Sequence, residues 1–370
     1  MVEGSDGSPV DRIGALAVDD IEDFWRENGL PGGGAYSLLD RVTSYDGVSA
    51  YGDPTFCGIG VSGPNAMYCI PEHSITWDRV GLLPTTHRDA GDMGVVTIIA
   101  HEIGHAVDAQ VEKKAETLRG EQRADCYAGA YLRWVAQGSS PRFSIDPLGI
   151  DKALETLAVV ADNPGHDAGH GILVERVWAA IQGFRFGAEV CADTTENDIK
   201  HQRSLLPTDP STGEARWTRS FAASTAETVS QVIGMPVEVS GTCYTASASW
   251  CPNTNSVAVN LAALQAAGEP ALSGVLGDGS GLALLTAALV TPWMEKSSAT
   301  DERVRACAVG YVAREMSTQR LPIQLSQGDP DEMLLALTGQ TPGQGFTTAE
   351  SFLNGLFLVD ALDGCLEPLD

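Results

Sequence analysis

The sequence predicts an α+β fold that is mostly helical and is divided into two related halves. Apolar residues recur at helical spacing through most of the chain, whereas short alternating segments typical of strands are few. The eight cysteines occur as consecutive pairs, and none has a CxxC spacing. Segments of the first half recur in the second half at matching offsets, which indicates an internal repeat.

The elements follow from these patterns in chain order. The expected parts are a flexible N-terminal segment over residues 1–17, a first domain over 18–193, a linker over 194–216 and a second domain over 217–370. Helices are predicted over residues 18–28, 94–118, 121–137, 150–160 and 171–187. Residues 75–77 alternate between apolar and polar side chains, and we expect an edge strand there that holds an extended peptide by backbone pairing.

Residues 101–105, His-Glu-Ile-Gly-His, form the most informative motif of the chain. Residues four apart share one face of a helix, so His101 and His105 can bind one ion while Glu102 lies beside it to act on a metal-bound water. With seven His in 370 residues, such an acid-containing pair is expected by chance only about 0.02 times. The surrounding residues are apolar, and two buried His without a ligand would be poorly satisfied there. The pattern therefore predicts a zinc site.

A zinc site needs a third protein ligand beside two His and a water. One known arrangement places it three residues after a Gly, but Asp108 and Val111 occupy those two positions here. The other arrangement draws a Glu from a second helix, four residues before an Asp that orients a bound His, and Glu121 and Asp125 have this spacing. Asp108 and Glu112 remain alternative ligands. A solvated acidic turn at a helix N-terminus remains the alternative interpretation of Glu121 and Asp125.

In this order the motifs resemble the predicted neutral zinc metallopeptidases of bacteria. That family has an HExxH helix, a Glu-x-x-Ala-Asp-Cys segment, an upstream Cys pair and a later His-Gly-x-x-x-x-Arg stretch before an aromatic, Gly-rich region. The matching segments within residues 18–193 are residues 20–25, 57–58, 68–71, 75–78, 91–93, 101–105, 121–129, 170–176 and 178–187. Arg123 departs from the family, which usually has Gln there, and puts a cation near the site.

The resemblance implies a zincin-like, gluzincin-type metallopeptidase domain that acts on a peptide or protein substrate. Zn²⁺ would be held by His101, His105 and Glu121, and Glu102 would accept the proton of the attacking water. The resemblance also implies His170 as a donor to the developing oxyanion. A helix-capping or surface role is the alternative for His170.

Composition narrows the class of protein further. A net charge of −26 and a pI near 4.5 argue against nucleic-acid binding, because a phosphate backbone would be repelled. A hydrophobic content of 43% over 370 residues excludes wholesale disorder. No apolar run approaches the length that a membrane-spanning helix needs.

The cysteines favour an oxidising compartment. The predicted disulfides are Cys57–Cys69, Cys126–Cys191, Cys243–Cys251 and Cys307–Cys365. We therefore expect a secreted or cell-surface protein, whose polar, Gly- and Ser-containing start suits a tether behind a removed signal segment or lipid anchor at a membrane. A buried free thiol is the alternative for Cys126.

The second half resembles a degenerate copy of the first. Residues 250–260 match residues 68–78 at identical offsets, and residues 302–312 align with residues 121–131. All seven His lie at or before His201, so we expect the second copy to have lost the metal site. Two unrelated helical halves that share cysteines by accident are the alternative.

Two other functions remain open for the same residues. The first is a cell-envelope binding or scaffolding module with a structural or vestigial zinc site. A structural zinc site is closed by four protein ligands, and the sequence offers no fourth His or Cys near these helices except Cys126. The second is amidase action on cell-wall peptide, which the same site could catalyse.

Overall fold

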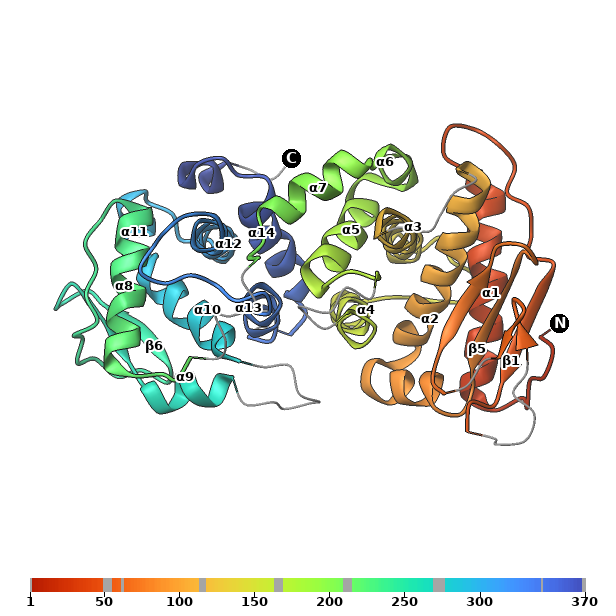
Figure 1. Cartoon of the computed structure of the whole chain (residues 1–370), viewed down its shortest axis with the longest axis horizontal. Helices are drawn as coiled ribbons and strands as arrows, with labels where there is room; N and C mark the ends of the chain where they lie inside the picture. The colour runs from red at the N-terminus through yellow and green to blue at the C-terminus, as the bar shows by residue number, and fades with distance from the viewer. Residues whose placement is uncertain are drawn as a thin grey trace. The chain divides into compact units, whose positions relative to one another are not determined.

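The computed structural model describes residues 2–48, 55–60, 63–112, 118–162, 169–208, 215–268, 277–340 and 342–367. Within these ranges the chain is mostly helical with a few small sheets, which confirms the α+β prediction (Figure 1). Internal contacts divide the chain into two compact units. The first comprises Met1–Asp162 and Ala168–Ile199, and the second comprises Asn163–Asp167 and Lys200–Asp370.

The first unit opens with α1 (Pro9–Asn28), which begins well before the start predicted at residue 18. The N-terminal segment expected to be flexible is therefore helical from Pro9 onward. Ser8 caps this helix by accepting a hydrogen bond from the Asp11 N–H, and proline suits the first helical position. The Asp11 carboxylate is fully buried and accepts a hydrogen bond from Trp77 Nε1 at 2.8 Å. These long-range contacts order the start of the chain.

A three-stranded sheet covers one side of this unit, with β5 (Ser74–Asp78) between β1 (Arg41–Tyr45) and β4 (Ala66–Cys69). β1 runs parallel to β5, and β4 runs antiparallel to it. The prediction of an edge strand over residues 75–77 is wrong, because β5 is the central strand and every one of its residues is buried. Among the described strands of this sheet, β4 lies at an edge. A second small ladder pairs β2 (Thr55–Phe56) with β3 (Ile59–Gly60).

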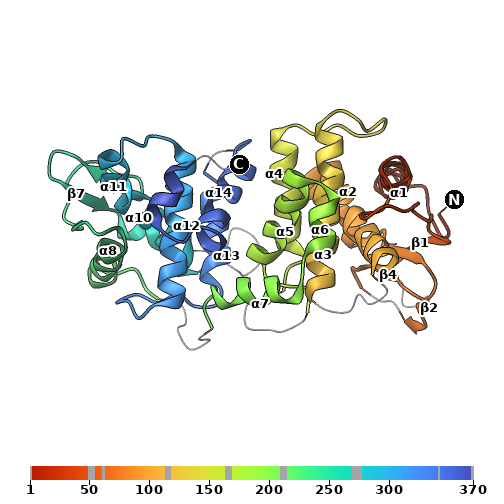
Figure 2. The same ribbon diagram turned by 90° about the horizontal axis from the view of Figure 1, so that it is seen from above.

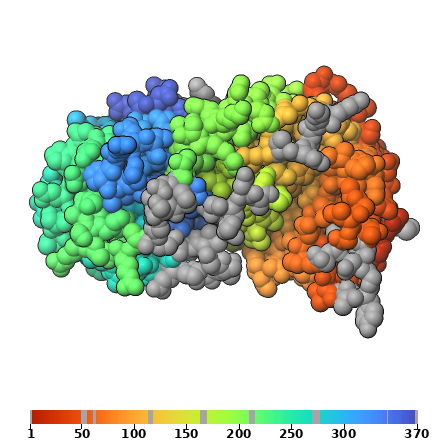
Figure 3. Space-filling view, viewed as in Figure 1, coloured from red at the N-terminus to blue at the C-terminus, as the bar shows by residue number. Residues whose placement is uncertain are grey.

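Six helices follow the sheet in the described residues, and the last of them, α7, begins in the first unit and ends in the second. They are α2 (Leu82–Val111), α3 (Leu118–Ala136), α4 (Pro147–Val159), α5 (Leu173–Phe186), α6 (Ala188–Asp193) and α7 (Glu196–Ser204). α2 starts earlier than predicted and is kinked at Gly91, whose φ of 69° is available to glycine without strain. α7 lies inside the predicted linker. Figure 2 shows α3, α5 and α6 side by side, and in the space-filling view of Figure 3 the residues of the sheet and of α2 are coloured in shades of orange.

The second unit is built from helices and one hairpin. Its elements are α8 (Arg219–Ile233), β6 (Ala248–Cys251), β7 (Ser256–Val259), α9 (Leu261–Ala267), α10 (Asp278–Leu289), α11 (Thr291–Lys296), α12 (Glu302–Thr318), α13 (Asp329–Thr338), α14 (Gly345–Phe357) and the 3₁₀ helix η1 (Leu362–Leu366). The β6–β7 hairpin pairs Trp250 with Val257, as the β4–β5 hairpin pairs Tyr68 with Ile75. The two hairpins therefore have the same register.

The two units also share one helix crossing. α3 meets α5 through Gly129 and Gly183, where a Cβ on Gly183 would lie 1.7 Å from the Cys126 carbonyl oxygen. α12 meets α14 in the same way, because a Cβ on Gly355 would lie 2.0 Å from the Cys307 carbonyl oxygen. Only glycine permits such close backbone approach. Each crossing is thus secured at a cysteine-bearing turn of the first helix.

All four predicted disulfides are present, and each lies within one unit. They are Cys57–Cys69, Cys126–Cys191, Cys243–Cys251 and Cys307–Cys365. Cys126 is therefore bonded rather than a free thiol. Within the described part of the chain, none of the helices combines the length and the apolar character needed to span a bilayer.

Candidate metal centre

The two helices that carry the predicted ligands pack unusually closely. α2 supplies His101, Glu102 and His105 from one face, and α3 supplies Glu121. Gly104 lies at the contact, where a Cβ would be only 2.5 Å from the Ala124 carbonyl oxygen. This glycine inside the motif therefore allows α3 to come near enough for its first turn to face the two imidazoles.

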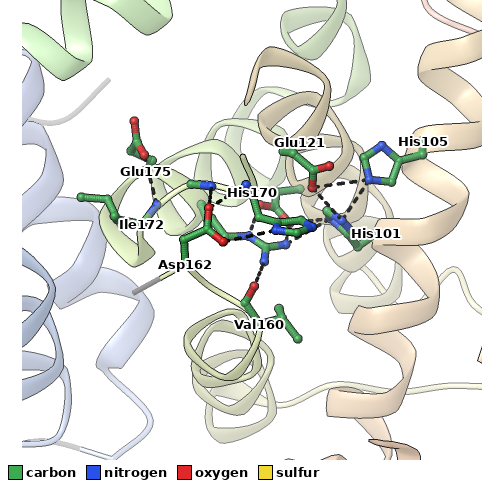
Figure 4. Close-up of polar contacts among 11 residues, drawn as sticks. His101, His105, Glu121, Val160, Asp162, His170, Ile172 and Glu175 are labelled. Carbon is green, nitrogen blue, oxygen red and sulfur yellow. Dashed lines mark hydrogen bonds and ion pairs between the residues drawn. The ribbon is translucent and has the colours of Figure 1, made fainter. Parts of the chain in front are cut away.

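Three side chains converge between α2 and α3, as Figure 4 shows. His101 Nε2 and His105 Nε2 are 3.1 Å apart, and Glu121 Oε2 lies 3.4 Å and 3.5 Å from them. A tetrahedral zinc ion with bonds of about 2.0–2.2 Å sets its ligand atoms about 3.3–3.6 Å apart. The two distances to Glu121 lie within this range and the distance between the imidazoles is 0.2 Å shorter, so the three atoms have nearly the spacing of one face of a zinc coordination tetrahedron.

The electrostatics of this cluster favour a cation. Glu121 Oε2 is buried and has no hydrogen-bond partner among the described residues. Burial alone would raise the pKa of Glu121, but the His101 and His105 imidazoles hold it well below its usual range. Burial alone would likewise lower the pKa of His101, but the Asp125 carboxylate raises it to about 10. The surrounding residues therefore stabilise positive charge where the three donor atoms meet, and the donor set fits Zn²⁺.

His101 is fixed from behind by two buried residues. Asp125 Oδ1 lies 2.7 Å from His101 Nδ1, which leaves Nε2 directed toward the other donors. Arg176 of α5 donates to both oxygens of Asp125, at 2.7 Å and 2.8 Å, and to the Val160 carbonyl at 2.6 Å. Arg176 belongs to one of the motifs, but the sequence predicted no role for it, because nothing near it in the chain indicates that it contacts Asp125.

Arg123 does not reach the candidate metal centre. Its Nη1 donates to Asp108 at 3.1 Å and to Glu112 at 2.5 Å, and its Nη2 donates to the Thr194 carbonyl at 2.9 Å. Asp108 and Glu112, the alternative ligands in the sequence, are therefore committed to this cation. The departure at position 123 points away from the donor atoms and joins α2, α3 and the chain after α6.

Glu102 and His170 both face the space next to the donor atoms. Glu102 is buried, and burial raises the pKa of its carboxyl, although the charges of His101 and His105 oppose this. The side chain of His170 is 55% exposed, and its Nδ1 lies 3.2 Å from Asp162 Oδ1. Asp162 also accepts the His170 backbone N–H at 2.7 Å, so one carboxylate holds this residue at the rim of the cavity (Figure 4).

The cluster opens into two adjoining cavities of about 330 Å³ and about 470 Å³. Both are lined by His101, Glu102 and His170, and by Asn65 and Ala66 at the start of β4. An elongated ligand can therefore pass over the donor atoms beside β4. The Asp78 N–H bonds the Asn65 carbonyl at 2.8 Å.

That bond sets the alternation of the β4–β5 ladder. With Asn65 and Asp78 as a hydrogen-bonded pair, Met67 faces β5 and the backbone of Tyr68 faces the opposite way. The Tyr68 side chain lines the smaller cavity, and its hydroxyl is 2.9 Å from His73 Nδ1. β4, rather than the predicted residues 75–77, therefore offers the strand edge next to the candidate metal centre.

Comparison of the chain with protein-family models, curated proteins and solved structures finds no match. The family resemblance of residues 18–193 thus remains a prediction from motifs.

Proposed function

We propose that this protein is a zinc-dependent metallopeptidase with a zincin-like first unit. The observation that carries the proposal is the convergence of His101, His105 and Glu121 beside the Glu102 carboxylate, at the boundary of two cavities. Two nitrogens and one carboxylate oxygen are typical of a catalytic zinc site, which keeps one position for water or substrate.

His101, His105 and Glu121 would hold the ion. Bound Zn²⁺ supplies Lewis-acid chemistry, polarising a carbonyl and lowering the pKa of a water to about 7. Asp125 holds His101 by its Nδ1, so Nε2 keeps its direction. Arg176 in turn keeps the Asp125 carboxylate ionised and in place.

Glu102 is the proposed general base. Its carboxylate takes the proton of the attacking water and later returns it to the leaving amine. Burial strengthens its basicity relative to an exposed carboxylate. His170, held by Asp162 at the rim, is the proposed donor to the oxyanion. The exposed edge of β4 would align an extended peptide by backbone hydrogen bonds.

The number of ligands separates this proposal from a structural zinc site in a scaffolding module. Closed structural sites use four protein ligands. Within the described residues the metal-binding group consists of three. The same site would also serve an amidase acting on cell-wall peptide, and substrate identity distinguishes the two hydrolases.

We also infer that the second unit is a degenerate copy of the first, working outside the cytoplasm with it. The shared hairpin register, the paired glycine crossings and the matching disulfides support a duplication. The disulfides support an oxidising compartment for both units. Residues 217–370, the predicted second copy, contain no His, so that copy would not repeat the chemistry.

The test is Glu102→Gln beside a matched control, Glu155→Gln, which changes an exposed acid of α4 paired with Lys152. We expect Glu102→Gln to keep stoichiometric zinc but to lose casein hydrolysis by at least a hundredfold, because the base is gone and the ligands remain. The control should match the unmodified protein, and a chelator should abolish its activity. Full hydrolysis by Glu102→Gln would reject the mechanism, and absence of bound zinc would reject the site.

A further inference from the structure

The larger cavity beside the candidate metal centre has a closed apolar end. It lies between the two parts of α2 on either side of the Gly91 kink and the last turn of α4. Thr86 comes from before the kink, Thr97 and Ile98 from after it, and Thr156 and Leu157 from α4. All five side chains are buried. The kink of α2 thus creates a recess that ends about one helical turn from Glu102 and His101.

The three threonines make this recess apolar in spite of their hydroxyl groups. Thr86 Oγ1 donates to the Leu82 carbonyl at 2.9 Å, and Thr97 Oγ1 donates to the Met93 carbonyl at 2.7 Å. Thr156 Oγ1 donates to the Lys152 carbonyl at 2.9 Å. Each hydroxyl is therefore committed to its own helix. A ligand in the recess meets methyl groups rather than unsatisfied donors.

The floor of the recess is tight. A Cβ on Gly94 would lie 3.0 Å from Thr86 Cγ2 and 3.0 Å from Thr156 Oγ1, so Gly94 packs closely against two of the threonines that line the recess. Ile98 and Leu157 form its sides. The recess therefore has a limited depth, which suits a side chain of leucine size better than a large aromatic one.

Charge is confined to the mouth of the cavity, where Glu102, Arg176 and His170 lie. Arg176 is bonded to Asp125, and His170 to Asp162. A charged side chain in the recess would lose its hydration among methyl groups, which is far costlier than burying an apolar group. The recess thus selects apolar side chains by contact and also disfavours charged ones.

We propose that this recess is a specificity pocket that accepts a medium-sized, uncharged apolar side chain of the residue next to the scissile peptide bond. The inference rests on the proposed peptidase function for the position of the bond. It adds the substrate class: proteins or peptides with Leu, Ile, Met or Val at one position flanking the cleavage point.

The first experiment measures binding without turnover. Zinc-loaded protein is titrated with two series of short peptide hydroxamates, one with the variable side chain on each side of the metal-binding group. The variable residue is Leu, Asn, Asp or Lys, of which the first three are nearly isosteric. We expect Leu to bind at least tenfold more tightly than Asn in one series, and Asp and Lys to bind more weakly still. Equal affinities for Leu, Asn and Asp in both series, or binding of none, would overturn the pocket.

The second experiment reshapes the recess. Ile98→Phe should reduce the volume and shift the preference from Leu toward Ala by about tenfold, whereas Ile98→Ala should shift it toward Phe. Leu148→Ala is the matched control. Leu148 is 48% exposed, and it lies on α4, which also lines the recess, but outside the cavity. Zinc content is measured for every variant. Opposite shifts from the two substitutions cannot arise from general destabilisation, and unchanged preferences in both would sink the assignment.

Cleavage of a peptide library then separates the two proposals. Apolar enrichment at one flanking position supports the pocket. Efficient cleavage with equal acceptance of Asp, Lys and Leu at both positions refutes the pocket and leaves the peptidase intact. A Leu preference in hydroxamate binding without hydrolysis of any peptide refutes the peptidase and keeps the pocket.

Discussion

Arg176 offers the sharpest test of how the candidate metal centre is held. It is buried with only 1% of its surface exposed, and it makes two hydrogen bonds to the fully buried Asp125 and one to the Val160 carbonyl. Arg176→Met keeps much of the volume but leaves the Asp125 carboxylate buried without its cation. Breaking a buried ion pair from one side costs about 3–5 kcal/mol of unfolding free energy. Arg176→Lys should fall in between, because an ammonium cannot reproduce the two parallel bonds.

The effect on zinc follows from the same contacts. Without Arg176, Asp125 takes up a proton or turns away, and His101 loses the partner that fixes its ring. Loss of such a partner weakens metal binding by about 10–100-fold. Asp125→Asn should cost a similar factor by a direct route. Because both changes break one chain of contacts, the double variant should lose about as much zinc affinity as either single variant.

The assay is competition for zinc against a chromophoric chelator, combined with urea unfolding in metal-free buffer. Arg41→Met is the matched control, since Arg41 forms an exposed ion pair with Glu72 and should contribute less than about 1 kcal/mol. The double variant should also regain part of the stability that Arg176→Met loses, because no unpaired charge remains. If the double variant lost zinc affinity by the product of the two single factors, Arg176 and Asp125 would not act through one chain of contacts. An Arg176→Met variant that binds zinc normally would refute the reasoning as well.

Two further predictions concern stability. Zinc should raise the unfolding temperature of the first unit only. At a free zinc concentration a thousand times the dissociation constant, the added stability should be about 4 kcal/mol. Calorimetry with and without chelator checks this, and a zinc-dependent shift in the unfolding transitions of both units would contradict a single site. Arg119 and Arg123 lower the pKa of Glu112 from 4.5 to about 2 by hydrogen bonding. An acid with a depressed folded pKa adds stability above its unfolded pKa, and this is lost as pH falls from about 4.5 toward 2. In the presence of chelator, Glu112→Gln should therefore flatten the pH dependence of the free energy of unfolding between about pH 4.5 and 2. An unaltered slope would show that Glu112 does not cause this pH dependence.

Local spacing was sufficient to predict the candidate ligands. Four-residue steps place His101 and His105 on one helix face and Glu121 above Asp125 on another, and the helix period alone fixes these relations. The disulfides were also predictable from the sequence. The cysteines occur as two consecutive pairs in each half, and pairing them in chain order gives the observed bonds.

What the sequence did not reveal depends on partners distant in the chain. Residues 75–77 alternate as an edge strand would, but β1 arrives from the other side and makes β5 central. The start of α1 depends on Asp11 bonding Trp77, 66 residues away. Arg123 was expected to place a cation near the metal, but in the fold Asp108, Glu112 and the Thr194 carbonyl bind it instead.

Comparison of the two units distinguishes features of the helix packing from the residues of the candidate metal centre. Both have the hairpin register, the glycine crossing and the disulfide at the crossing, although residues 217–370 contain no His with which to bind zinc in the same way. These features are needed because a crossing with no room for a Cβ brings two helices within backbone contact, and the disulfide then secures their spacing. In the first unit the same close packing, repeated at Gly104 between α2 and α3, brings Glu121 to the two imidazoles. The candidate metal centre thus uses a kind of close helix packing that the second unit has as well.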